Sequence, residues 1–485
     1  MTHPIKCGSI KLIRFATALM LLSVLTLPLD AQQRRAPKKP TPQYLSFAEA
    51  QPVISTLAEI LPADLKGKSE SEIAAAWAGW IARYDAQIRS RLAQGDEDSI
   101  VNFLLFGTSF TRQPRVTLPQ LQQLNQEQKN RLLDGVIVAR VRDLIRAALA
   151  PGANDRLAFV RRVLIGKGFH LETAGGRSNA EKFLTASLNR VITENSGYAR
   201  TLEAARLQGD ASEEFAARSR LFRDRGLSSD TSLLPNFAIE QSLAELKARN
   251  LLSPVSVKRV AIVGPGLDFT DKQEGYDFYP LQTIQPFALI DSLLRLGLAK
   301  DTDLQVTTFD LSDRVNGHLA QARARARAGQ PYVVQLPRDE AAQWKPESIR
   351  YWQQFGDQIG SPVAPAAIPV NAPNLKSRAV RIAPSTVLKI SPVDTNIVLQ
   401  RLELPAQDKF DLIIATNILV YYDNFDQSLA MLNIEKMLTP GGFLLSNNAL
   451  LELPFFKVHS VGYSTVVYSD RPNDGDHIVW YRRSP

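Results

Sequence analysis

Two different spacings of hydrophobic residues divide the chain near residue 254. From residue 44 to residue 253, hydrophobic residues recur every three or four positions, as they do on the buried face of amphipathic helices. One such stripe lies between residues 71 and 92 and contains Ile73, Trp77, Trp80, Ile81, Tyr84 and Ile88. Serine–glutamate capping boxes predict three helix starts, at Ser46, Ser69 and Ser178. The pattern therefore predicts an all-α domain over residues 44–253.

From residue 254 to residue 485, short β-branched runs alternate with helical segments. This alternation predicts parallel strand–helix–strand units in an α/β domain. The expected strands are VKRVAIV (257–263), DLQVTTFD (303–310), NIVLQRLEL (396–404), FDLIIATNIL (410–419) and FLLSNN (443–448). The last two segments, 455–469 and 477–483, predict an antiparallel hairpin that closes a mainly parallel sheet. Between about residues 331 and 392 the alternation stops and prolines accumulate, so we interpret this stretch as an insertion with a long irregular loop.

The first 43 residues follow neither pattern. A basic start precedes an uncharged, mostly apolar run over residues 15–29. This layout is typical of a secretory signal peptide, here residues 1–31, and predicts an exported protein, periplasmic or secreted. The alternative is an uncleaved membrane anchor through residues 15–29, and only this alternative would hold the protein at a membrane. Residues 32–43 are basic and rich in proline, and they predict a disordered tether.

Composition supports a globular protein and excludes several kinds of site. Hydrophobic residues make up 45% of the chain and charged residues 22%, which is enough for ordinary cores. The formal net charge of +8 includes an excess spread over the helical half without a basic block, so there is no strong nucleic-acid signal. Cys7 is the only cysteine, so a chain cleaved after residue 31 has no disulfide, thiolate metal site or cysteine nucleophile. The metal-binding HExxH motif, the Walker loop and the Gly-x-Ser-x-Gly elbow are also absent from the sequence.

Two strand ends in the α/β half carry residue types that suit a nucleoside ligand. The first strand ends in Gly264-Pro265-Gly266, and glycines there let the backbone turn sharply and approach a ligand. A turn required only by folding explains the same glycines equally well. The second strand ends in Asp310, whose carboxylate can accept hydrogen bonds from both hydroxyls of a ribose. Phe269 stands where a dinucleotide-binding loop has its third glycine, which weakens the hypothesis of a nicotinamide-dependent oxidoreductase.

The third strand-end motif is the most discriminating. The run KFDLIIATNILVYYD begins at Lys409, and LTPGGFLL follows from Leu438. The order Gly-x-Gly, acid, FDLI-type strand and LxPGG-type turn resembles the class I S-adenosylmethionine-dependent methyltransferases. Within that superfamily, FDLIIATNILVYYD is similar to the corresponding strand of the chemotaxis-receptor (CheR-type) methyltransferases. The resemblance covers roughly residues 258–450 and leaves the helical half unexplained.

The resemblance implies a Rossmann-like methyltransferase fold with S-adenosylmethionine across the carboxyl ends of its strands. Matched by motif, Gly264 and Gly266 would face the amino-acid and ribose part of the cofactor. Asp310 would bind the ribose hydroxyls. Glu403 takes the place where an acid or polar residue often meets the adenine. No metal is expected in this site.

By the same resemblance Asn417, at the tip of the fourth strand, would face the methionine end of the cofactor and the substrate. Tyr421 or Tyr422 would flank the pocket, and all three residues are weak catalytic candidates. Ordinary helix packing accounts for both tyrosines as well. Thr416 stands where CheR-type enzymes carry an arginine, and the Asn/Asp-Pro-Pro-aromatic signature of nitrogen-methylating enzymes is absent, so the acceptor does not transfer from either family. Three histidines are candidate bases only by position: His318, His459 and His477.

Two functions from different classes follow from these residues. The first is S-adenosylmethionine-dependent methyl transfer to an unidentified small-molecule or protein acceptor. The second is an exported, non-catalytic binding or interaction protein that retains a methyltransferase fold. The intact Gly264, Gly266 and Asp310 favour the first hypothesis. The predicted export favours the second, because S-adenosylmethionine is made in the cytoplasm and is expected to be scarce outside.

Overall fold

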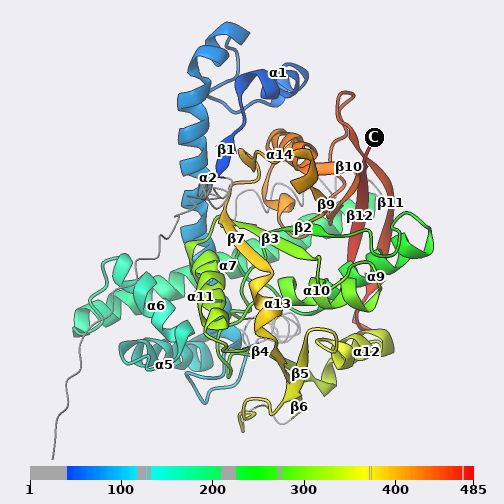
Figure 1. Ribbon diagram of the computed structural model, residues 1–485. Helices are drawn as coiled ribbons and strands as arrows, with labels where there is room; N and C mark the ends of the chain where they lie inside the picture. Colours follow the sequence, from blue (N-terminus) through cyan, green and yellow to red (C-terminus); the bar gives the residue numbers. More distant parts are fainter. Residues whose placement is uncertain are drawn as a thin grey trace, which may run out of the picture. The chain divides into compact units, whose positions relative to one another are not determined.

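Seven strands form the central sheet in the order β11-β12-β10-β9-β2-β3-β7 (Figure 1). Within this sheet β12 runs antiparallel to both of its neighbours, and the other pairs are parallel. The strands are β2 (Arg259–Val263), β3 (Gln305–Asp310), β7 (Ile390–Asp394), β9 (Phe410–Ala415), β10 (Leu438–Ser446), β11 (Val458–Val467) and β12 (Gly475–Arg483). A mainly parallel sheet with an antiparallel closing hairpin is the Rossmann-like methyltransferase fold that the sequence predicts, so the predicted fold class is confirmed.

The computed structural model describes residues 41–116, 133–208, 226–270, 276–370, 374–471 and 474–485, together with Glu127, Arg131 and Ala372. Thr41–Pro485 forms one compact unit. The predicted signal peptide and residues 32–40 of the predicted tether lie outside the described residues. The end of the tether prediction is wrong, because β1 (Pro42–Tyr44) pairs with β8 (Gln400–Leu402) and is therefore ordered. Among the described helices, none has the length and apolar character needed to span a bilayer.

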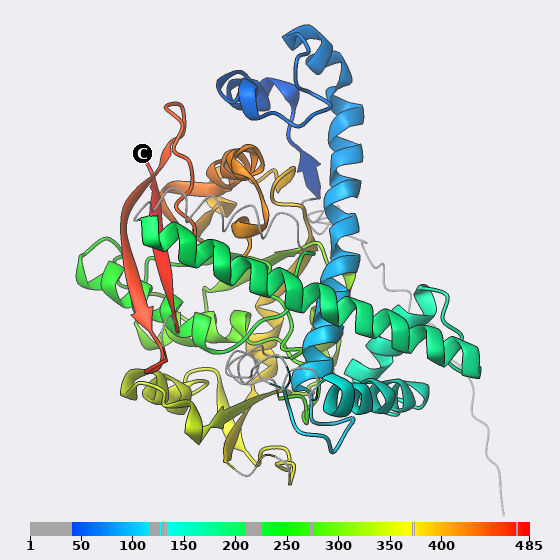
Figure 2. The same cartoon turned by 180° about the vertical axis from the view of Figure 1, so that it is seen from behind.

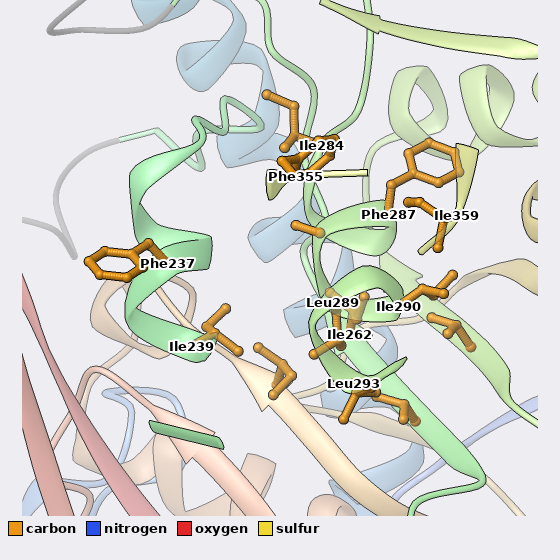
Figure 3. Close-up of a cluster of buried hydrophobic side chains, with 14 of the residues drawn as sticks. Phe237, Ile239, Ile262, Ile284, Phe287, Leu289, Ile290, Leu293, Phe355 and Ile359 are labelled. Carbon is orange, nitrogen blue, oxygen red and sulfur yellow. The ribbon is translucent and has the colours of Figure 1, made fainter. Parts of the chain in front are cut away.

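Helices cover both faces of the sheet, because its inner strands are hydrophobic on both sides. In β2, Val260 and Ile262 belong to one hydrophobic cluster, and Ala261 and Val263 belong to another. Figure 3 shows part of the first cluster, around Ile262. The helices of the first cluster include α9 (Leu234–Ala248), α10 (Gln285–Arg295) and α11 (Asp313–Arg327), and those of the second include α1 (Phe47–Thr56) and α14 (Asn424–Met437). Since α9 packs on β11, β12 and α10, the helical half supplies one of the helices that cover the sheet.

The rest of the helical half packs around the long helix α2 (Glu70–Phe106), which α7 (Ala174–Gln208) contacts in Figure 2. The other elements here are η1 (Ala58–Ile60), a π-helical turn η2 (Leu133–Ile137), α5 (Val138–Leu149) and α6 (Asp155–Gly166). The predicted stripe of α2 is confirmed: Tyr84 is half-buried and its other members are buried. The capping boxes at Ser46 and Ser69 form, but Ser178 lies inside α7. That helix begins at Ala174, where Thr173 Oγ1 accepts the N–H of Gly176 at 2.9 Å.

The predicted insertion contains more regular structure than its prolines suggest. A three-stranded antiparallel sheet has the order β4-β6-β5. Its elements are β4 (Tyr332–Asp339), η3 (Glu340–Ala342), α12 (Pro346–Gln354), β5 (Gly360–Val363), β6 (Leu375–Ile382) and α13 (Pro384–Leu388). The central sheet resumes at β7, whereas NIVLQRLEL supplies only the short β8, so the expectation of a sheet strand over 396–404 is wrong. Two short 3-10 turns, η4 (Ala406–Asp408) and η5 (Leu419–Tyr421), flank β9.

A half-buried histidine, His318, links the insertion to the core and makes stability depend on pH. The Tyr332 hydroxyl accepts the N–H of Thr283 and lies 2.7 Å from His318 Nε2. Burial lowers the pKa of His318 to about 4, so the folded protein holds this ring neutral. Below pH 6.5 the unfolded chain binds a proton here that the folded chain does not, so stability is lost as pH falls towards 4. We expect this group to cost about 2 kcal/mol of the free energy of unfolding between pH 7 and pH 5.

Urea unfolding of the protein and of His318→Gln at pH 7 and pH 5 tests this expectation. The glutamine keeps an oxygen that can accept the Tyr332 hydroxyl but cannot be protonated in this range. The variant should therefore lose less stability on acidification than the unchanged protein. Equal losses in the two proteins would contradict the assignment of His318 as a neutral group.

Candidate functional site

A cavity of about 960 Å³ lies over the carboxyl ends of the central strands. Its floor is made by the residues that follow four neighbouring strands: Gly264 and Gly266 after β2, Asp310 at the end of β3, Asn417 after β9, and Asn447 after β10. Open parallel sheets bind ligands at this edge, where the strand order reverses on either side of the first strand. The predicted site residues Gly264, Gly266, Asp310, Asn417, Tyr421 and Tyr422 therefore all line one cavity. Glu403 is the one predicted site residue that does not line it.

The glycine loop after β2 requires glycine at two positions. Gly264 has φ 66° and Gly266 has φ 64°, in the left-handed region that other residues avoid. A Cβ atom on Gly266 would lie 2.8 Å from the carbonyl oxygen of Ser229. That close approach exists because the segment 228–231, which we call the strap, crosses the loop. Leu267 N–H donates to the Ser229 carbonyl at 2.7 Å, and Thr231 N–H donates to the Leu267 carbonyl at 2.9 Å.

Asp310 lies in the cavity wall beside the glycine loop, and its predicted contact with a ribose stays a prediction. Its side chain is 9% exposed, and one carboxylate oxygen accepts the N–H of Ser312 at 2.8 Å. The N–H of Gly264 donates to the Phe309 carbonyl at 2.8 Å, which joins the glycine loop to the tip of β3. Burial raises the pKa of Asp310 to about 7, and the N–H of Ser312 and the nearby Arg314 guanidinium oppose that rise. Asp310 is therefore placed to change its charge near neutral pH.

Glu403 lies outside the cavity, which corrects the predicted adenine contact. Its side chain is 62% exposed and forms an ion pair with Arg401. The prediction assumed that residues 396–404 form a strand of the central sheet, but β8 pairs with β1 instead. Thr395 and Ile397 line the cavity in its place, directly after β7. The signal that could have located them is the short run ISPVD, which ends at Asp394.

The substrate-side candidates Asn417, Tyr421 and Tyr422 all line the cavity. Asn417 has φ 58°, and its N–H donates to Asn447 Oδ1 at 2.8 Å. Both tyrosines are buried, and burial raises the pKa of Tyr422 above its ordinary value. Arg91 of α2 donates to the Tyr421 carbonyl at 2.9 Å, and its guanidinium lies 5.7 Å from the centre of the Tyr422 ring. Both tyrosines are therefore packed in the protein interior and also form part of the cavity wall.

Of the three candidate histidines, only His477 lines the cavity. Its Nδ1 lies 2.9 Å from Thr465 Oγ1, and partial burial lowers its pKa. His318 is bound to Tyr332 in the core, and His459 Nδ1 lies 3.2 Å from Glu452 in an exposed pair. The structure thus leaves His477 as the one candidate histidine in contact with the cavity.

Sequence reasoning missed the contribution of the helical half, which holds the loop after β2. Arg156 of α6 is 1% exposed, and its guanidinium donates to four backbone carbonyls, those of Asp268, Phe269, Asp277 and Tyr279. The carboxylate of Asp277 in turn accepts the N–H groups and hydroxyls of Thr108 and Ser109. Residues of this loop line the cavity: Asp268, Thr270, Tyr276 and Tyr279. The helical half therefore shapes one wall of the site.

The helix α2 also contacts the segments after β7 and before the strap, near Asp310. Arg89 donates to Asp394 at 2.8 Å, and Asp85 accepts the side-chain amide of Asn396 at 2.7 Å. A Cβ atom on Gly95 would lie 1.9 Å from the carbonyl oxygen of Leu227, so this glycine lets the chain before the strap lie against the helix. These contacts join residues more than a hundred positions apart, and no local sequence signal predicts them.

The solved structures similar to this chain share little sequence identity with it. The chain is similar to the N-methyltransferase NodS from Bradyrhizobium japonicum WM9 at 14% identity, over 51% of this chain and 97% of that one, with a TM-score of 0.25. It is also similar to the glycopeptide N-methyltransferase MtfA (11% identity, 52% and 96%, TM-score 0.25). A TehB-like SAM-dependent methyltransferase from Corynebacterium glutamicum ATCC 13032 Kitasato is similar at 10% identity (51% and 98%, TM-score 0.21). No protein-family model and no curated protein matches the chain. The fold assignment therefore rests on the strand order, and the narrower resemblance to CheR-type enzymes stays a prediction.

Proposed function

We propose that the protein transfers methyl groups from S-adenosylmethionine to an acceptor. The observation that carries this proposal is the joint between the first two strand ends, where Gly264 N–H donates to the Phe309 carbonyl at 2.8 Å and Gly264, Gly266 and Asp310 all line the cavity. A ribose placed there would meet a carboxylate for its two hydroxyls and a backbone without Cβ atoms at close approach. A cavity of about 960 Å³ also has room for a second molecule beside the cofactor.

The residues present fit what methyl transfer requires of a protein. S-adenosylmethionine supplies a methyl group already activated by its sulfonium. The protein has to hold the acceptor atom in line with that methyl group at about 3–3.5 Å, and the resulting gain is mainly entropic. Asn417 and Asn447, bonded to each other at the tips of β9 and β10, fix the backbone between the two halves of the cavity. A general base is needed only if the acceptor atom carries a proton.

The titration of Asp310 predicts how cofactor binding depends on pH. The carboxylate form accepts both ribose hydroxyls, and because the pKa of Asp310 is raised to about 7, this form is the minority below neutrality. The ionised fraction rises about tenfold between pH 6 and pH 8, and the apparent affinity follows that fraction. We therefore expect S-adenosylhomocysteine to bind about tenfold more tightly at pH 8 than at pH 6. Calorimetric titration at both pH values measures this ratio.

The variant Asp310→Asn separates this effect from every other titration. It should lose about 1–3 kcal/mol of binding free energy at pH 8, because a charge-assisted hydrogen bond is lost, and its affinity should no longer change with pH through this group. Asp313→Asn, on an exposed acid at the start of α11, is the matched control and should behave as the unchanged protein. Unchanged affinity in a folded Asp310→Asn protein would refute the ribose assignment.

A further inference from the structure

The cavity continues away from Asp310 towards the closing hairpin. Its far wall is formed by residues 465–468 of and after β11 and by residues 474–477 at the start of β12, together with the loop after β2. Apart from His477, every charged side chain among the described lining residues is a carboxylate: Asp230, Asp268, Asp310, Asp474 and Asp476. The charge of this wall indicates which kind of methyl acceptor could bind beside the proposed cofactor.

A hydrogen-bond chain ties Asp476 to the tip of β9. Its carboxylate accepts the Tyr468 hydroxyl at 2.6 Å and the side-chain amide of Asn447 at 3.0 Å. Asn447 uses its oxygen for the N–H of Asn417, so its amide is oriented at both ends. Asp474, which is 7% exposed, accepts the Ser469 hydroxyl. These hydrogen bonds orient the two carboxylates at the hairpin end of the cavity.

Aromatic rings line the cavity together with these carboxylates. They are Tyr276, Tyr279, Trp344 and Tyr468, from three separate segments of the chain, and Tyr468 is bonded to Asp476. Aromatic faces next to carboxylates bind ammonium groups, because the ring face carries negative charge density that attracts a cation. An anionic ligand would be repelled by the carboxylates.

A buried hydrogen-bond acceptor in the cavity wall independently indicates a ligand that carries N–H donors. Asn236, in the first turn of α9, is 3% exposed and lines the cavity. Its side-chain nitrogen donates to the Ser232 carbonyl at 2.8 Å, which fixes the amide so that Oδ1 can only accept. Oδ1 has no partner among the described residues, and the Thr270 hydroxyl, 0% exposed in the opposite wall, has none either. Buried acceptors of this kind are normally satisfied, so a ligand rich in N–H donors fits the site.

We propose that the methyl acceptor is an amine, which enters as an ammonium ion and lies between Asp476, Asp474 and the aromatic wall. This inference rests on the proposed methyl transfer. The ammonium first loses one proton, through a cavity carboxylate, to water. The nitrogen lone pair then forms the N–C bond as the C–S bond breaks, and the electrons of that bond stay on sulfur. The products are an N-methylammonium ion and neutral S-adenosylhomocysteine, so charge and atoms balance.

The test uses the full chain saturated with S-adenosylhomocysteine and three probes of equal length. These are 1,5-diaminopentane, the neutral 1,5-pentanediol and the anionic glutarate. The diamine should bind at least tenfold more tightly than either control, and it alone should take up label from methyl-tritiated S-adenosylmethionine. Equal or tighter binding of the diol or glutarate would overturn the amine proposal. Failure of S-adenosylhomocysteine itself to bind would instead overturn the proposed function.

Variants of the carboxylates separate the acceptor from the cofactor. Asp476→Asn should weaken diamine binding at least tenfold while the affinities for S-adenosylmethionine and S-adenosylhomocysteine stay within threefold. Asp474→Asn provides a second variant if the first does not fold. Asp470→Asn is the matched control, on an acid of the same hairpin that pairs with Lys345 at the surface. If Asp476→Asn instead weakens S-adenosylmethionine selectively over S-adenosylhomocysteine, the carboxylate serves the sulfonium and the amine proposal is wrong.

Discussion

Replacing Arg156 by methionine is expected to lower the free energy of unfolding by about 3–5 kcal/mol, the range for breaking a buried charged network. The guanidinium is 1% exposed and satisfies the four carbonyls of the loop after β2. Methionine fills much of the volume but donates no hydrogen bond, so those buried carbonyls lose their partner. The loop carries Tyr276 and Tyr279 into the cavity wall, and the same change should loosen that wall.

Urea unfolding measures the stability loss, and amide hydrogen exchange of residues 268–270 and 276–279 measures the loosening. Exchange there should rise well above the change in β2 and β9, which the sheet protects. Arg162→Met, on an exposed arginine of the same helix, is the matched control and should change little. A loss below about 1 kcal/mol for Arg156→Met would mean that the loop holds its shape without the helical half, contrary to this account.

The second large effect is expected at Gly266. An alanine there must adopt φ near 64°, which costs about 1–2 kcal/mol for a residue with a Cβ atom. Its Cβ would also lie 2.8 Å from the Ser229 carbonyl oxygen, so the strap has to move, and overpacking of this kind costs about 1–3 kcal/mol. The strap and the loop both line the cavity. Gly266→Ala should therefore lower stability by about 2–5 kcal/mol and weaken S-adenosylhomocysteine binding at least tenfold.

Gly317→Ala is the control for that substitution. Gly317 lies inside α11 with no atom within 4 Å of an added Cβ, so alanine should be neutral or stabilise the helix by about 0.5–1 kcal/mol. Thermal unfolding and calorimetric titration of both variants give the comparison. Wild-type affinity in Gly266→Ala would show that neither the glycine loop nor the strap contacts the ligand.

The sequence was sufficient for the central sheet because its inner strands have one clear pattern. VKRVAIV and FDLIIA are hydrophobic on both faces, as strands covered by helices on both sides must be. The edge strand β7 was missed because Pro392 argues against a central strand. At the edge, where β7 pairs only with β3, a residue without an N–H is tolerated. Because β7 was not predicted, residues 396–404 were expected to take its place in the central sheet. Glu403 was therefore wrongly expected at the cavity.

The helical half could not be assigned a role from its sequence, since its key residues resemble surface charges. A positive excess without a basic block is typical of solvated helix faces, yet Arg140 and Arg156 are 0% and 1% exposed. Arg140 donates to the carbonyls of Leu104 and Gly107 and so fixes the turn that presents Thr108 to Asp277. The partners of these arginines are backbone carbonyls, which no residue pattern reveals. Burial of an arginine shows only in the folded chain.

The central claim is that the cavity at the carboxyl edge of the sheet binds S-adenosylmethionine. Calorimetric titration of the full chain with S-adenosylmethionine, S-adenosylhomocysteine and NAD tests it most directly. We expect the first two to bind with a Kd on the order of 1–100 µM and NAD not to bind. Absence of binding by the folded protein would contradict the account and favour the alternative of a non-catalytic protein that retains a methyltransferase fold. Preferential binding of NAD would contradict it as well and would favour a nicotinamide-dependent oxidoreductase.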